Sequence, residues 1–249
     1  ALSGVVAIGK DAFVGSSSTT TDANGTIAIG DAAGKAITSA QGSVAIGYNA
    51  LKDEDNGDFS VAIGYEALQA QTGTTGSVGN VALGYRAGYA NTTGIWNTLL
   101  GYQAGKAITT GSSNVAIGTD ALMSDTIGGN STAVGSWALS EYTKAGEGGG
   151  VVGNTAVGSN AMRYLDSAGA AGNTAVGFSA LAGTNQNTVT LNKNVAVGYQ
   201  ALNLLIGGTE NVAIGYGALD AQAGESGDGA TNDGHRNIAI GADAMGAVN

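Results

Sequence analysis

The sequence predicts an all-β solenoid of about thirteen stacked parallel coils, with one short strand in each coil. A phrase of the form Val/Ile/Thr-Ala-aliphatic-Gly-x-x-Ala occurs thirteen times in the 249 residues, with one Leu in place of the first Ala. Its glycines are 17 to 26 residues apart, and six of the twelve intervals are 17, so a coil of minimum length carries loops of variable length. No change in composition divides the chain, which predicts a single repeat domain over residues 1–249.

Each phrase predicts a strand. We number its positions from its glycine, called the signature glycine, so that position −3 lies three residues before it. Positions −3 and −1 are β-branched or aliphatic, as in Val44 and Ile46 or Val212 and Ile214. Two residues apart in an extended chain, they point the same way and suit a pleated surface. A helix would need spacings of three and four over a longer run.

The opposite face of the predicted strand carries only small residues. Position −2 is Ala in every copy except for Leu99, and position +3 is Ala in all thirteen. Columns of Ala and Gly indicate a thin coil, whose interior is too narrow for larger side chains. The predicted interior residues include Ala45, Gly47, Ala50, Ala62, Gly64, Ala67, Ala116, Gly118, Ala121, Ala213, Gly215 and Ala218.

The aliphatic stripe at positions −3 and −1 then points out of the coil. A stripe repeated over thirteen coils is larger than the apolar patches that monomers expose. The simplest way to bury this stripe is against the same stripe on other copies of the chain, which predicts a side-by-side homo-oligomer. The alternative is a monomer with Val and Ile inside and Ala outside. The predicted interface residues include Val44, Ile46, Val61, Ile63, Val81, Leu83, Val115, Ile117, Val195, Val197, Val212 and Ile214.

Three further columns accompany the strand. Position −4 is mostly Asn, which favours bends or coil-to-coil hydrogen bonds over a row that binds glycans. Position +1 is often Tyr, which favours a ladder covering the coil edge, with stacking on sugar rings as the alternative. Position +4 is mostly Leu or Met, and Gly34, Gly88 and Gly105 depart from this pattern.

Composition and motifs exclude several classes of function. The formal charge of −10 disfavours contact with nucleic acids and anionic membranes, and the apolar runs are too short to span a bilayer. His235 is the single histidine and lies in a predicted loop, and there is no cysteine. Residues 53–58 resemble the start of a calcium loop, but Gly64 stands where the bidentate Glu is required, so a hydrated acidic turn is predicted. We therefore expect no enzyme activity, cofactor or metal.

The Val-Ala-Ile-Gly-x-x-Ala phrase resembles the repeat of YadA-like heads in bacterial trimeric autotransporter adhesins. The runs at 114–118 and 154–158 are also similar to repeats in bacteriophage tail-fibre proteins. The resemblance implies a left-handed parallel β-roll, with three chains packed side by side. Adhesin heads keep a shorter and stricter period, and this chain shows no coiled-coil heptads.

These departures favour an extracellular segment of a phage tail fibre, a virion appendage that presents loops to a glycan or protein receptor on the host surface. The loops are predicted at 16–25, 72–79, 141–153, 165–172, 183–193 and 221–236. The alternative is an adhesin head on a bacterial surface. An ice-binding solenoid is less favoured, because only four copies have Thr at position −3.

Overall fold

The computed structural model describes residues 3–15, 23–72, 76–141, 153–165, 170–183, 191–204, 208–220 and 235–246. Among these residues every regular element is a strand, and no helix occurs. The chain divides into two compact units, Ala1–Asp120 and Ala121–Asn249. Each unit is a parallel β-solenoid, which confirms the predicted fold class. The hand of winding and the trimer stay predictions.

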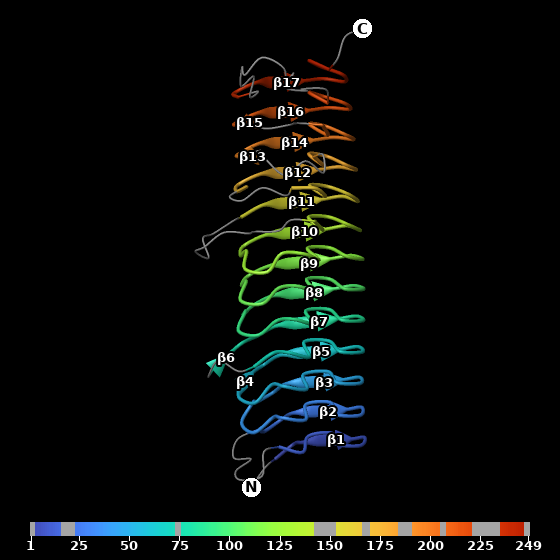
Figure 1. The fold of residues 1–249 in the computed structure, drawn as a ribbon, viewed down its shortest axis with the longest axis vertical. Coiled ribbons are helices and arrows are strands. Elements are labelled where there is room, and N and C mark those ends of the chain that lie inside the picture. The colour runs from blue at the N-terminus through green and yellow to red at the C-terminus, as the bar shows by residue number, and fades with distance from the viewer. Residues whose placement is uncertain are drawn as a thin grey trace. The chain divides into compact units, whose positions relative to one another are not determined.

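In the described part of the first unit, seven three-residue strands stack in parallel (Figure 1). They are β1 (Val6–Ile8), β2 (Ile27–Ile29), β3 (Val44–Ile46), β5 (Val61–Ile63), β7 (Val81–Leu83), β8 (Thr98–Leu100) and β9 (Val115–Ile117). Equivalent positions lie side by side, so that Ala45 pairs with Ala28 on one side and with Ala62 on the other. A second short ladder pairs β4 (Gly57–Asp58) with β6 (Gly76–Ser77).

The second unit repeats this arrangement with six stacked strands among its described residues (Figure 1). They are β10 (Thr132–Val134), β11 (Thr155–Val157), β12 (Thr174–Val176), β14 (Val195–Val197), β16 (Val212–Ile214) and β17 (Ile238–Ile240). A short ladder pairs β13 (Leu191–Asn192) with β15 (Gly208–Thr209). Thr132 pairs with Thr155, 23 residues on, and Val195 pairs with Val212, 17 residues on, in the same relative register.

The two alanine columns line the interior of each unit. The predicted interior alanines are all fully buried: Ala45, Ala50, Ala62, Ala67, Ala116, Ala121, Ala213 and Ala218. The flanking residues at positions −3 and −1 are half-buried or exposed, because alternate side chains of a strand point to opposite faces. This orientation is the reverse of the alternative in which Val and Ile form the interior.

The signature glycines lie at the rim of the coil. Gly47, Gly64, Gly118 and Gly215 are half-buried, which corrects the prediction that they fill the interior. The requirement for glycine is conformational. Gly30, for example, has a φ of 136°, and a Cβ built on it would lie 2.5 Å from the carbonyl oxygen of Gly47 in the next coil. Backbone passes backbone at this point, so no side chain fits.

The interior also holds large side chains, so the expectation of a space limited to Ala and Gly is wrong. The turn after each strand brings position +4 back into the coil through left-handed backbone, with a φ of 48° at Leu51 and 47° at Leu68. The largest fully buried side chains are Ile37, Leu51, Leu68, Leu99, Ile108, Leu122, Leu139, Met162, Leu165, Leu181 and Leu202. The thin part of the coil is therefore confined to the strand side.

Where position +4 is Gly, another side chain supplies the missing volume. A Cβ built on Gly34 would lie 2.8 Å from Cδ1 of Ile37 at position +7 of the same coil. A Cβ on Gly105 would lie 2.9 Å from Cδ1 of Ile108 and 2.6 Å from Cδ2 of Leu99. The interior is thus packed by compensation between columns, as expected for a close-packed core.

Candidate functional site

The first candidate surface is the association face, which we define as the outward side chains at positions −3 and −1 of the stacked strands. Leu83 is 48% exposed, and Ile117 and Ile214 are 36% and 39% exposed. The other predicted interface residues are half-buried: Val44, Ile46, Val61, Ile63, Val81, Val115, Val195, Val197 and Val212. In each unit these side chains form an apolar surface, and neither position carries a charged residue in any copy.

Aromatic ladders border the association face at position +1. In the first unit, Tyr48, Tyr65, Tyr85 and Tyr102 stack with centroid distances of 5.0, 5.5 and 5.2 Å and interplanar angles of 20° or less. In the second unit, Phe178, Tyr199 and Tyr216 stack at 5.2 and 5.3 Å. Offset stacking at these distances covers the ring faces with neighbouring rings. The ladders therefore favour a structural edge over a platform for sugar rings.

The asparagines at position −4 form a buried hydrogen-bonded ladder within each unit. In the first unit, the backbone N of Asn97 donates to Oδ1 of Asn80 at 2.8 Å. In the second, the backbone N of Asn194 donates to Oδ1 of Asn173 at 3.0 Å, and Asn211 donates in the same way to Asn194. These bonds confirm coil-to-coil bonding as the role of this column, and burial excludes a glycan-binding row.

A further left-handed column, in addition to those at positions +2 and +4, stands at position −5, which we call the outer corner. All thirteen corner residues have positive φ, between 56° and 73°. Six are glycines: Gly4, Gly25, Gly42, Gly79, Gly153 and Gly172. The other seven are Phe59, Trp96, Ser113, Asn130, Lys193, Glu210 and Arg236. Sequence reasoning missed this column, although its constant offset from the signature glycine could have revealed it.

Several polar side chains at position −6, next to the corner, accept hydrogen bonds from the backbone of the preceding coil. Asp58 Oδ1 accepts a hydrogen bond from the backbone N of Gln41 at 2.7 Å, and Asn192 Oδ1 accepts one from the backbone N of Ala171 at 2.8 Å. His235 belongs to this row, because its Nδ1 accepts from the backbone N of Thr209 at 3.1 Å. The single histidine is exposed and lies outside the strands, as predicted, and it also makes a structural contact.

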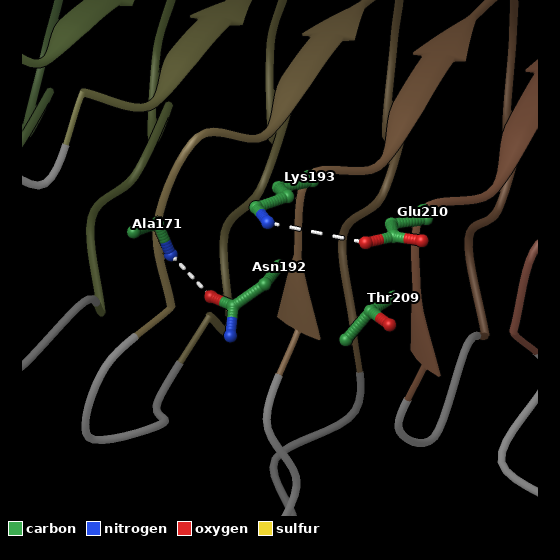
Figure 2. Close-up of a pocket in the computed structure, with 5 residues that line it drawn as sticks. All are labelled: Ala171, Asn192, Lys193, Thr209 and Glu210. Carbon is green, nitrogen blue, oxygen red and sulfur yellow. Dashed lines mark hydrogen bonds and ion pairs between the residues drawn. The ribbon is translucent and has the colours of Figure 1, made fainter.

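In the second unit the corner borders a groove of about 320 Å³ (Figure 2). Ala171, Asn192, Lys193, Thr209 and Glu210 line it, and Figure 2 shows Lys193 and Glu210 facing one another across it. Lys193 Nζ lies 3.9 Å from Glu210 Oε1, and Arg236 Nε donates to Glu210 Oε2 at 2.8 Å. The groove is thus an exposed, polar surface with charges of both signs, suited to binding, and Oγ1 of its Thr209 lies 2.9 Å from Nδ1 of His235.

The charge of Glu210 is stabilised by its neighbours. The hydrogen bond from Arg236 lowers the pKa of Glu210, and the positive charge of Arg236 adds to the effect. The carboxylate therefore remains ionised and acts as a hydrogen-bond acceptor over the physiological range of pH.

Glu54 is the exception in the predicted hydrated acidic turn at 53–58, where Asp53 and Asp55 are exposed. Its side chain is fully buried, and its Oε1 accepts hydrogen bonds from the backbone N of Gly57 at 2.6 Å and of Asn56 at 3.0 Å. Its Oε2 accepts from Nε2 of Gln71 at 2.5 Å. Burial raises the pKa of Glu54 above its ordinary value, against the opposing effect of these hydrogen bonds.

The described residues contain no group of three or more His, Cys, Asp or Glu side chains that could hold a metal ion. They also contain no helix long and apolar enough to cross a membrane. Parts of all six predicted loops, at 16–22, 73–75, 142–152, 166–169, 184–190 and 221–234, lie outside the described residues. Comparisons with protein-family models, curated proteins and solved structures found no match.

Proposed function

We propose that this chain is a structural and attachment protein, a homotrimeric segment of a phage tail fibre that acts outside the cell. The single observation that carries the proposal is the orientation of the strands. The interior of each unit is complete without the aliphatic stripe, because fully buried Ala and Leu side chains fill it, together with Ile in the first unit and Met162 in the second. The stripe is therefore available to join separate chains.

The chemistry of the association face supports self-association. Apolar surface gains free energy of roughly 25 cal/mol for each Å² removed from water. The face repeats with the coil, so a copy of the same chain presents a matching repeat, and rotational symmetry can apply one contact along the length of each unit. The number three comes from the resemblance to trimeric adhesin heads and tail-fibre repeats.

Sedimentation equilibrium tests the assembly. We expect a mass of three 24.1 kDa chains. Ile63→Glu in the first unit and Val197→Glu in the second place a charge on the association face and should together shift the protein toward single chains. Leu204→Glu is the matched control, because Leu204 is 47% exposed and lies outside that face. A wild-type protein that sediments as one chain would contradict the proposal, as would a double variant with the wild-type mass.

Attachment is assigned to the outer corner and to the surface beside it. The groove residues Ala171, Asn192 and Lys193 belong to two of the predicted loops, 165–172 and 183–193, and Arg236 ends a third. Loops of variable length on a rigid repeat are a common place for binding specificity. A host-surface glycan or protein is the proposed receptor. The second candidate, an adhesin head, shares the association face, and a gene that also encodes a coiled-coil stalk and a membrane barrel would favour it.

A further inference from the structure

Two aromatic side chains stand exposed at the outer corner of the first unit, away from the stacked tyrosines. Phe59 is 54% exposed and Trp96 is 57% exposed. Each ring lies over the corner glycine of the preceding coil. A Cβ built on Gly42 would lie 3.0 Å from Cδ1 of Phe59, and one built on Gly79 would lie 3.2 Å from Cδ1 of Trp96. One edge of each ring therefore lies close to backbone, and more than half of each side chain is accessible to solvent.

The backbone at these two residues is unfavourable for a bulky side chain. Phe59 has a φ of 62° and Trp96 a φ of 58°, in the left-handed region that glycine adopts without strain. Leu51 and Leu68 are also left-handed, but their side chains fill the interior. The corner residues all share this backbone, so it is the exposure of two large rings that have no place in the interior that indicates a role at the surface.

The two rings are two coils apart. The coil of Gly79 lies between the coils of the two rings. The backbone N of Gly79 donates to the carbonyl oxygen of Asp58 at 3.2 Å, and the backbone N of Trp96 donates to the carbonyl oxygen of Val78 at 2.9 Å. At ~4.8 Å for each coil, the rings repeat at roughly 10 Å. This distance is comparable to that between alternate sugar rings in an extended chain of β-1,4-linked pyranoses. Such sugars present flat faces of C–H groups that pack on aromatic rings.

The surroundings of the rings suit a neutral polyhydroxylated ligand. Two polar side chains at position −6 are held by hydrogen bonds, Asp58 next to Phe59 and Ser112 in the coil after Trp96: Asp58 accepts from the backbone N of Gln41, and Ser112 Oγ accepts from the backbone N of Ile95 at 3.1 Å. Rigid polar groups beside the rings lose little entropy when they bind hydroxyl groups. The formal charge of −10 disfavours an anionic polymer.

We infer that Phe59 and Trp96 form a stacking platform for an extended chain of β-1,4-linked pyranose sugars. The inference rests on the attachment role proposed above, because it names the class of glycan that the first unit would bind. Cellohexaose and chitohexaose are the probes, since both are extended and β-linked. Maltohexaose is the control ligand, because its α-linkages curve the chain away from an extended repeat.

Isothermal titration calorimetry of the intact protein tests the platform. The decisive variants are Phe59→Gly and Trp96→Gly, because glycine occupies the same corner at Gly42 and Gly79 and suits its backbone. We expect each to weaken binding of the β-linked probes by about tenfold or more and the double variant to abolish it. Trp96→Phe should retain binding, and Leu204→Ala, at an exposed residue in the other unit, should leave it unchanged.

Absence of saturable binding of both β-linked probes by the wild-type protein would overturn the inference, as would equal binding by the double glycine variant or by maltohexaose. Sedimentation of the same samples separates this outcome from failure of the assembly. If the protein sediments as a trimer but binds no sugar, the stacking platform is contradicted and the proposed assembly is not. If the protein sediments as a single chain and binds β-linked sugars, and the double glycine variant does not bind them, the trimer is contradicted and the platform is supported.

Discussion

Leu99 and Gly88 occupy one space between adjacent coils of the first unit. A Cβ built on Gly88 would lie 2.7 Å from Cδ1 of Leu99. Leu99 is the one departure from Ala at position −2, and Gly88 is one of three glycines at position +4. Leu99 therefore exchanges volume with two of these glycines, Gly88 in the preceding coil and Gly105 in its own.

This exchange predicts strong coupling between Leu99 and Gly88. Leu99→Ala should cost about 2–5 kcal/mol of unfolding free energy, because it leaves a cavity. Gly88→Leu alone should cost about 1–3 kcal/mol through overpacking. The double variant places the usual residues in both columns and should recover part of the loss, by about 0.5–3 kcal/mol. Urea denaturation of the four proteins measures this coupling, and purely additive effects would contradict it.

The signature glycines predict a different kind of sensitivity. Gly30→Ala forces a Cβ onto the carbonyl oxygen of Gly47 at an unfavourable φ, and should cost about 3 kcal/mol or more. Gly25→Ala at the outer corner is the control. Its φ of 73° is also left-handed, but a Cβ would come no nearer than 3.9 Å to the next coil, so we expect a cost of about 1 kcal/mol. Equal melting temperatures for the two variants would show that backbone approach is unimportant.

Glu54 predicts a pH dependence of stability. Its pKa in the folded state lies above the ordinary 4.5, so the folded protein binds this proton more tightly than the unfolded chain does. The contribution of Glu54 to the free energy of unfolding is fully present below pH 4.5, and it is lost as the pH rises through the pKa of Glu54 in the folded protein. Glu54→Gln should remove this loss. Guanidinium denaturation from pH 4 upward measures both proteins, and parallel pH profiles would show that Glu54 does not titrate as described.

The asparagine ladder predicts a local loss of protection in the second unit. Asn194 Oδ1 accepts from the backbone N of Asn211 at 3.0 Å, and its Nδ2 donates to the carbonyl oxygen of Gly208 at 3.0 Å. Asn194→Ala removes both of these hydrogen bonds from buried groups and should cost about 1–3 kcal/mol. Hydrogen exchange at the Asn211 amide should accelerate more than at Asn97, in the other unit. Similar acceleration at both amides would indicate a global effect.

The strands and their two faces could be predicted from the sequence because their signals recur at fixed offsets. Ala at −2 and aliphatic residues at −3 and −1 alternate with the period of a strand, and Ala45 and Val44 lie on opposite faces as this period requires. The inward turn of Leu51 could not be predicted in this way, because it depends on a left-handed backbone that Leu rarely adopts.

The candidate site was harder to predict for physical reasons. The outer corner accepts any residue that tolerates a left-handed φ. Glycine, aromatic and charged residues therefore all occur there, and they share no common chemistry. Phe59 and Trp96 therefore show no periodicity of their own. The burial of Glu54 could not be predicted, because a charged residue in an acidic run is ordinarily solvated and its partner Gln71 stands in the next coil.

The constant register of unequal segments has a practical consequence. β10 and β11 pair as regularly as β14 and β16, although six more residues separate the first pair. Since the entropy of closing a segment grows only slowly with its length, a foreign peptide grafted between two such strands should leave the solenoid folded. The architecture thus separates what holds the protein together from what it displays, and libraries of displayed sequences could be built on one unchanged frame.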